Sequence, residues 1–296
     1  MQDPINEILP AQLAMATVPS TVITIVERLM AAGHECYCVG GCVRDLLMGR
    51  EVGDWDLTTS AQPQEVVSLF DRVVETGLQH GTVTVCEGGS AFEVTTYRID
   101  VGASDGRRPD EVRFTRSLTE DLKRRDFTMN ALAWCPPTGH FVDLFDGQSD
   151  IDSKVIRAVG DASLRLHEDG LRGLRALRFM STLGFRCTGS LRAAIQETRH
   201  VFEKVSVERI WQEMQKLLLG GDVEASLMTL MDCGLLPSFW PVFEQPRVEG
   251  LSDMPPRIEI RLAYLFSENP EAFDGSASRL KLPKKLVKRV SHLVSQ

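Results

Sequence analysis

The chain has 296 residues, of which 43% are hydrophobic and 25% charged, and its formal net charge at pH 7 is −8. This length leaves room for two domains, and the composition is ordinary for a soluble globular protein. No apolar run approaches the roughly 18 residues that span a bilayer, and Met1–Pro4 does not begin a signal peptide, so we expect a cytoplasmic protein without membrane contact. The negative charge argues against a generally basic nucleic-acid binder but allows local basic patches.

The predicted elements change in character along the chain. Apolar spacing indicates an amphipathic helix over 20–33, and a proline in the first turn favours a second helix over 63–70. Strands are predicted over 35–39, 54–58, 82–86, 91–98 and 111–115. Helices are predicted over 163–183, 190–198, 206–219, 223–234 and, with a basic face, 280–295. We therefore expect an α+β fold, in which a small mixed β-sheet with helices is followed, from about residue 160, by an all-α portion.

The most informative stretch is Val39–Asp45, which contains a glycine pair, Gly40 and Gly41. Two aspartates, Asp54 and Asp56, follow this stretch closely. Glycines let backbone amides approach a phosphate closely, because no Cβ intervenes. Two aspartates at i and i+2 of a strand project from one face and can hold a divalent metal together. Either half alone fits a turn or a solvated strand end. Together they predict a nucleotidyl-transfer site, which needs both a phosphate cradle and paired carboxylates.

Further charged residues fit such a site. Glu93 stands between apolar neighbours in a predicted strand, where a third acid near the metal and a solvent-facing residue are equally good interpretations. A turn-rich loop carries Asp105, Arg107 and Arg108. A later stretch places a cation beside a carboxylate and an amide, in Arg125, Asp126 and Asn130.

Cysteine and histidine offer two competing interpretations. Seven cysteines, an odd number, are typical of reduced thiols in a reducing compartment. His34, Cys36, Cys38 and Cys42 can be written as a zinc site, but Cys36 and Cys38 lie in a predicted buried strand rather than a knuckle, which favours buried thiols. A nucleophile made of Cys42 and His80 is disfavoured, because nothing supplies an oxyanion hole.

A second candidate site lies in the predicted helix over 163–183. There Asp169 and Arg172 fall one turn apart, so that a carboxylate and a guanidinium offer acceptors and donors to one base edge. An ordinary salt bridge between them is the alternative. Each step of three residues drifts by about 60°, so Arg178 points away from Asp169. Arg175 and Arg178 are therefore assigned to phosphate or to bracing neighbouring elements.

The ordered motifs resemble those of the class II tRNA nucleotidyltransferases, which are the bacterial CCA-adding enzymes and their poly(A) polymerase relatives. The matching motifs are Gly40-Gly41-x-Val43-Arg44-Asp45, Asp54-x-Asp56, Arg124-Arg125-Asp126-Phe127-Thr128-x-Asn130-Ala131, Glu168-Asp169-x-x-Arg172 and Ser206-Val207-Glu208-Arg209-Ile210. Five motifs in this order, between about residues 20 and 235, are specific where any one of them is not.

The resemblance implies roles for these residues. Asp54 and Asp56 would hold two Mg²⁺ ions, and Glu93 is kept, from its strand position alone, as a candidate third catalytic acid. The incoming nucleotide's triphosphate or sugar would be contacted by residues of the glycine and arginine motifs, namely Gly40, Gly41, Arg44, Arg125, Asp126 and Asn130. Asp169 and Arg172 would read the Watson–Crick edges of CTP and ATP, with Arg175 and Arg178 as further nucleotide contacts.

The resemblance also divides the chain. Residues 1–160 would form a nucleotidyltransferase head, 161–235 a helical neck with base recognition, and 236–296 part of a helical, RNA-binding body. Residues 104–114, with Asp105, Arg107 and Arg108, match the flexible loop of CCA-adding enzymes. Because family members are usually longer than this chain, the family's C-terminal tail is expected to be absent.

We therefore expect a Mg²⁺-dependent enzyme that adds C, C and A to the 3′ end of tRNA from CTP and ATP, without a nucleic-acid template. Residues 80–85 and 93–98 resemble the CCA-adding rather than the poly(A) polymerase type. The alternatives are an enzyme that adds only A or only CC, a bacterial poly(A) polymerase, and a catalytically silent RNA-binding homologue. The predicted metal ligands argue against the last, since a binding module does not need them. The oligomeric state stays open.

Overall fold

The computed structural model describes residues 8–102, 111–240 and 246–295. The described residues divide into two compact units. Unit 1 contains those up to Gly160 except 154–156, and unit 2 contains 154–156 and everything from Asp161. No helix in these ranges is both long and apolar enough to cross a membrane. A mixed sheet in the first unit and helices in the second confirm the predicted α+β class.

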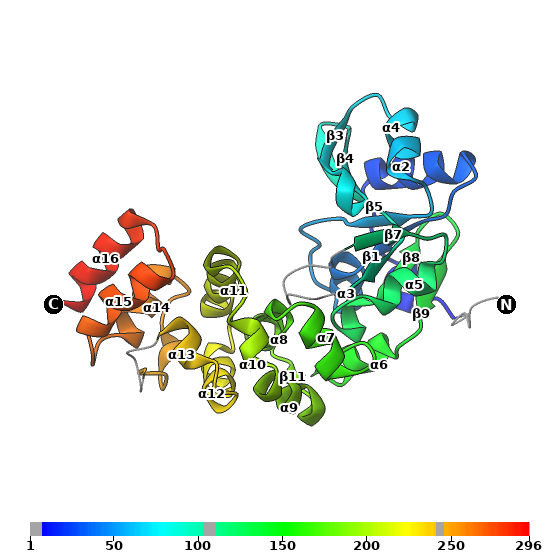
Figure 1. Cartoon of the computed structure of the whole chain (residues 1–296). Coiled ribbons are helices and arrows are strands. Elements are labelled where there is room, and N and C mark those ends of the chain that lie inside the picture. Colours follow the sequence, from blue (N-terminus) through cyan, green and yellow to red (C-terminus); the bar gives the residue numbers. More distant parts are fainter. Residues whose placement is uncertain (1–7, 103–110, 241–245, 296) are drawn as a thin grey trace. The chain divides into compact units, whose positions relative to one another are not determined.

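Unit 1 is built on a seven-stranded sheet of order β3-β4-β5-β2-β1-β8-β9 (Figure 1). The strands are β1 (Cys36–Val39), β2 (Leu57–Thr59), β3 (Val73–Gly77), β4 (Thr82–Glu87), β5 (Ser90–Thr96), β8 (Leu132–Cys135) and β9 (His140–Asp143). Within this sheet, as far as the structure describes it, β2 and β5 pair in parallel and the other neighbouring strands are antiparallel. The central strands β1, β2 and β8 are buried along their whole length, which explains their almost continuous runs of apolar residues and threonine.

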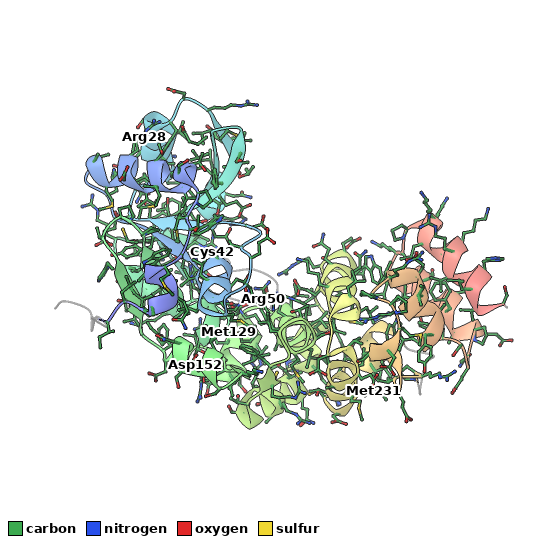
Figure 2. All side chains as sticks on the ribbon, turned by 180° about the vertical axis from the view of Figure 1, so that it is seen from behind. Arg28, Cys42, Arg50, Met129, Asp152 and Met231 are labelled. Carbon is green, nitrogen blue, oxygen red and sulfur yellow. The ribbon has the colours of Figure 1, made fainter. Side chains whose placement is uncertain are left out.

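Short helices surround this sheet. They are α1 (Ala11–Ala14), α2 (Ser20–Ala31), α3 (Gly41–Leu47), α4 (Pro63–Leu69), α5 (Leu118–Lys123) and α6 (Gly147–Asp152). The helix predicted after residue 62 begins at Pro63, where the Glu65 side chain accepts a hydrogen bond from the Gln62 backbone N–H at 2.7 Å. Cys42 and Met129, labelled in Figure 2, are among the buried side chains.

Two strand predictions need correction. The strand expected over 54–58 begins only at Leu57, so Asp54 and Asp56 precede β2 rather than belong to it. The strand expected over 91–98 ends at Thr96, and a separate strand, β6 (Arg98–Val101), pairs with β7 (Glu111–Phe114) in a second, two-stranded sheet. Tyr97 separates the two strands, and its backbone N–H donates to Thr59 at 2.8 Å.

Unit 2 is almost entirely helical. Its helices are α7 (Ala162–Glu168), α8 (Leu171–Leu183), α9 (Gly189–Glu197), α10 (Arg199–Phe202), α11 (Val207–Leu219), α12 (Val223–Asp232), α13 (Leu236–Phe239), α14 (Ile258–Leu265), α15 (Glu271–Arg279) and α16 (Lys284–Val294). A short parallel pair, β10 (Val155–Ile156) with β11 (Arg186–Cys187), adjoins them.

The prediction of a single helix over 163–183 is wrong, because Asp169 and Gly170 interrupt it and separate α7 from α8. Asp169 takes an extended conformation there. Gly170 packs against the backbone of α10, where an added Cβ would lie 2.8 Å from the Cα of Phe202. This tertiary contact requires glycine and fixes the break.

Candidate active site

A tight glycine turn joins β1 to α3. Gly40 has a φ of 76°, a left-handed conformation that favours glycine. A Cβ added to it would lie 3.3 Å from Nη1 of Arg125. The turn therefore needs glycine both for its backbone conformation and for the close approach of an arginine predicted to bind the nucleotide.

Asp54 and Asp56 lie in the extended segment that leads into β2. The Val39 backbone N–H donates to the Asp56 carbonyl at 3.0 Å, which ties this segment to the end of β1, directly before the glycine turn. In the parallel pair, Leu57 lies opposite Val94, so Asp56 is level with Glu93 on β5. The register thus brings the two predicted metal ligands and the third predicted acid together.

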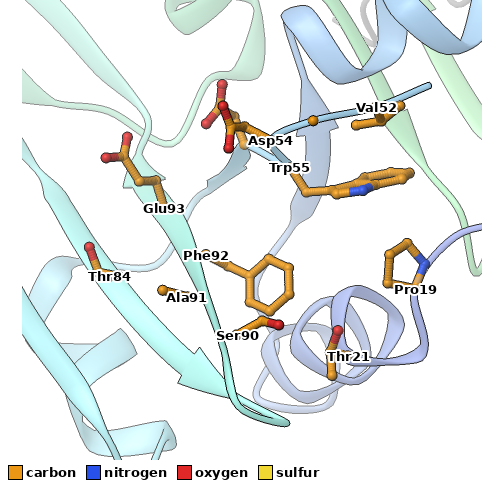
Figure 3. A pocket seen from close by; sticks show the side chains of 12 residues that line it. Pro19, Thr21, Val52, Asp54, Trp55, Thr84, Ser90, Ala91, Phe92 and Glu93 are labelled. Atoms are coloured by element: carbon orange, nitrogen blue, oxygen red, sulfur yellow. The ribbon is translucent and has the colours of Figure 1, made fainter. Parts of the chain in front are cut away.

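These acids border a cavity of about 690 Å³. The carboxyl groups of Asp54 and Glu93 lie on the same side of it, while the Trp55 ring turns the other way, toward Pro19 (Figure 3). All three acidic residues are exposed to solvent. The site is therefore accessible to a charged ligand from outside.

The electrostatics of the cluster favour a bound cation. The pKa of Asp56 is raised, first by loss of hydration among protein atoms and then by the negative charges of Glu93 and, more weakly, Asp54. The positive charge of Arg125 acts in the opposite direction. Among the described residues, no group of three or more His, Cys, Asp or Glu side chains is close enough to hold a metal ion. Asp54 and Asp56 can offer carboxylate oxygens, the ligands that divalent cations such as Mg²⁺ prefer.

Behind the glycine turn, three of the predicted nucleotide-binding residues form one chain of hydrogen bonds. Arg44 is buried, and its Nη1 donates to Oδ1 of Asn130 at 2.7 Å while its Nε donates to Oδ1 of Asp45 at 3.0 Å. The Asn130 amide in turn donates to Oδ1 of Asp126 at 3.1 Å. The structure thus brings Arg44, Asp126 and Asn130 together, and these contacts fix the orientation of each side chain.

The sequence interpretation missed Asp121. This residue of α5 has an exposed fraction of 0%, and its carboxylate accepts hydrogen bonds from both Arg124 and Arg125. The available signal was an acid placed three and four residues before two adjacent arginines, which is the helical spacing of an ion pair.

In unit 2, Asp169 and Arg172 do not form the predicted pair on one face of a continuous helix. Asp169 Oδ1 instead accepts from the Leu171 backbone N–H at 3.1 Å and caps α8, while Oδ2 accepts from Nη2 of Arg209 on α11 at 2.7 Å. Arg172 Nη1 donates to Glu168 at 2.5 Å. Because the break separates the two residues, each has a different ionic partner.

Arg175 and Arg178 converge on Glu213 of α11. Arg178 Nε donates to its carboxylate at 2.9 Å, and Nη1 of Arg175 lies 3.7 Å from it. Glu213 is 7% exposed, and the Arg178 guanidinium also lies 3.5 Å from the centre of the Phe179 ring. These contacts brace α8 against α11, one of the two roles expected for these arginines.

Two further sequence predictions concern the predicted flexible loop and the cysteines. Asp105, Arg107 and Arg108 lie outside the described residues. Cys36, Cys38 and Cys42 are buried free thiols, and burial raises the pKa of the Cys36 thiol.

Comparison with known proteins places this geometry in a family. The model of the poly A polymerase head domain matches residues 36–157, and that of a "probable RNA and SrmB-binding site of polymerase A" matches 184–245. The CCA-adding enzyme of Lactobacillus delbrueckii subsp. bulgaricus is 48% identical over 223 residues, covering 75% of this chain and 56% of the relative. That of Latilactobacillus sakei is 50% identical over 213 residues, covering 72% and 53%.

A crystal structure of the Bacillus stearothermophilus CCA-adding enzyme in complex with CTP has a similar fold, with a TM-score of 0.84 and 36% identity over 94% of this chain and 70% of that one. The chain belongs to the class II tRNA nucleotidyltransferase family. It spans about half the length of the curated relatives named here. The head-domain match starts at the first residue of β1 and contains the glycine turn, Asp54, Asp56, Glu93 and Arg125.

Proposed function

We propose that this chain catalyses template-independent addition of C, C and A to the 3′ end of tRNA, with CTP and ATP as substrates. The observation that carries the proposal is the exposed pair Asp54 and Asp56, which lies beside the glycine turn and level with Glu93. Support comes from relatives of about half identity named CCA-adding enzymes, and from the similar B. stearothermophilus structure, which holds CTP.

In the reaction, the 3′-hydroxyl oxygen of the tRNA bonds to the α-phosphorus of the nucleotide, and the bond to pyrophosphate breaks. Two Mg²⁺ ions held by Asp54 and Asp56 would supply charge neutralisation and a lowered pKa of that hydroxyl. The backbone of the glycine turn would cradle the triphosphate, and Arg125 would attract its negative charge. Most of the catalysis is then positioning and electrostatic stabilisation.

We further propose that residues 1–160 act as the catalytic head, 161–235 as the neck that selects the base, and 236–296 as part of the RNA-binding body. Asp169 and Arg172 remain the proposed base-reading pair, each held by a separate partner, Arg209 or Glu168. Exposed cations on α16 would contact tRNA phosphates. These cations are Lys284, Lys285, Lys288 and Arg289. Free thiols fit a reducing compartment such as the cytoplasm.

The test is to incubate the chain with Mg²⁺ and tRNAs that end before CCA, after C, and after CC, giving CTP and ATP separately and together. We expect C on the first two substrates and A on the third. Addition of A alone or of CC alone would identify an enzyme of restricted specificity, and long runs of A a poly(A) polymerase. No incorporation on any of the three substrates would contradict the proposal.

A further inference from the structure

The buried carboxylate of Asp121 has both oxygens occupied. Oδ1 accepts hydrogen bonds from Nε and Nη2 of Arg124 at 3.0 and 2.7 Å, and from the Arg98 backbone N–H at 3.3 Å. Oδ2 accepts from Nη2 of Arg125 at 3.1 Å. The Thr58 hydroxyl lies 3.2 Å from Oδ2 and 3.2 Å from the Thr95 carbonyl oxygen, so its one proton is shared between these two acceptors. One side chain thus joins α5 to β2 and to the first residue of β6.

Asp121 is a charged anchor. Its burial alone would raise the pKa, but the positive charges of Arg125 and Arg124 outweigh that effect and lower the pKa below its ordinary value. The ionised carboxylate has therefore lost its hydration in exchange for directed hydrogen bonds, which constrain the groups that donate them.

Two of these donors lead directly to the candidate active site. Thr58 is fully buried and lies two residues beyond Asp56, at the centre of β2. Arg125 reaches the glycine turn, because a Cβ added to Gly40 would lie 3.3 Å from its Nη1. Asp121 therefore contacts both the strand that follows the proposed metal ligands and the guanidinium beside the glycine turn.

Ion pairs link the arginines and acids around Asp121. Among the ion pairs of the described residues, Arg98 and Arg124 pair with Asp100, while Arg124 and Arg125 pair with Asp121. Arg125 commits Nη2 to Asp121, while its Nε is buried and makes no hydrogen bond within the described part of the chain. Because a guanidinium has five N–H donors, Arg125 keeps donors for a further anion.

We propose that Asp121 is a positioning residue, which aims Arg125 at the nucleotide triphosphate and fixes β2, and with it Asp56, relative to that guanidinium. The inference rests on the proposed function. Arg124 already gives Asp121 a counter-ion with two hydrogen bonds, so the links to Arg125 and Thr58 exceed what neutralisation requires.

The test compares Asp121→Asn and Thr58→Val with the unchanged chain and a matched control. Asp150→Asn is the control, because Asp150 is 3% exposed and also pairs with a threonine and an arginine of unit 1, Thr128 at 2.6 Å and Arg157 at 2.9 Å. For each protein we would measure the thermal midpoint, kcat, the KM for CTP, the Mg²⁺ concentration for half-maximal rate, and equilibrium binding of CTP with Mg²⁺.

We expect Asp121→Asn to weaken CTP binding, raise the KM and lower kcat, with kcat/KM falling about 10²-fold, as is typical of a misplacement of about 1 Å. Thr58→Val should raise the Mg²⁺ requirement with little change in the KM, and it serves as the second test if Asp121→Asn does not fold. Asp150→Asn should lose stability but keep the KM.

Equal losses of stability in Asp121→Asn and Asp150→Asn, with an unchanged KM, CTP affinity and Mg²⁺ requirement in every variant, would overturn the inference. If the unchanged chain incorporates no nucleotide, the proposed function fails instead. The positioning role is then decided by CTP affinity alone, which Asp121→Asn must lower and Asp150→Asn must not.

Discussion

Asp169 has two structural contacts and one proposed chemical role, and substitution can separate them. It caps α8 through Leu171 and pairs with Arg209 at 2.7 Å, with side chains that are 22% and 30% exposed. A lost cap costs about 1 kcal/mol, and a partly exposed ion pair contributes at most about 1 kcal/mol. Asp169→Ala should therefore lower the stability by about 2 kcal/mol, which is roughly 4–8 °C in the thermal midpoint.

Asp169→Asn keeps the cap, because asparagine caps helices as well as aspartate, but it removes the charge and the second acceptor oxygen. A base-edge hydrogen bond lost from a buried partner costs about 1–3 kcal/mol, so selectivity for CTP and ATP should fall about 5- to 150-fold, while stability should fall by at most about 1 kcal/mol through the lost ion pair with Arg209. Arg209→Met removes only the ion pair and should cost about 1 kcal/mol of stability.

The assay is incorporation of each of the four nucleoside triphosphates, measured separately, alongside thermal denaturation of the same preparations. If Asp169→Asn keeps the preference for CTP and ATP while Asp169→Ala and Arg209→Met lose stability, Asp169 is only a cap and an ion-pair partner. That result would refute the base-reading role.

Three further predictions concern other parts of the site. Gly40→Ala should raise the KM for CTP and ATP in steady-state kinetics, because a Cβ at a φ of 76° also crowds Arg125; an unchanged KM would exclude the glycine turn from triphosphate binding. Glu213→Gln should destabilise the chain by about 3 kcal/mol in urea, since it removes the buried carboxylate that Arg175 and Arg178 share, and a loss below 1 kcal/mol would contradict the bracing role. Converting the four exposed cations of α16 to glutamine should reduce the slope of log affinity for tRNA against log salt by up to about 0.7–0.9 per lost contact, and an unchanged slope would remove α16 from the RNA interface.

Much of unit 1 was predictable because its chemistry is local in sequence. The glycine turn, Asp54 and Asp56 lie within 17 residues and keep their relation in the fold. Strands such as β1 and β4 were found because their side-chain patterns match their burial. Helices α3 and α5 were not, since two turns or fewer show no clear periodicity, whereas the equally short α4 was found from the proline in its first turn.

The remaining features depend on contacts between distant segments. Asp121 becomes an anchor only because Thr58 and Arg98, 63 and 23 residues away, donate to it. The break at Gly170 comes from packing against Phe202, while the local sequence Leu166–Leu177 is compatible with a continuous helix. Arg209 was part of a recognised motif, yet its bond to Asp169 crosses 40 residues.

Asp54 and Asp56 are the proposed ligands of the metal ions for nucleotidyl transfer. The most direct measurement is the rate of CMP and AMP incorporation into tRNA lacking CCA, across a Mg²⁺ series, for Asp54→Asn, Asp56→Asn and Glu51→Gln. Glu51 is a matched control, an exposed acid three residues before Asp54. We expect both aspartate variants to lose addition of C and of A while keeping their fold and tRNA affinity, and Glu51→Gln to stay fully active. Near-normal Mg²⁺-dependent incorporation by either aspartate variant would contradict this assignment.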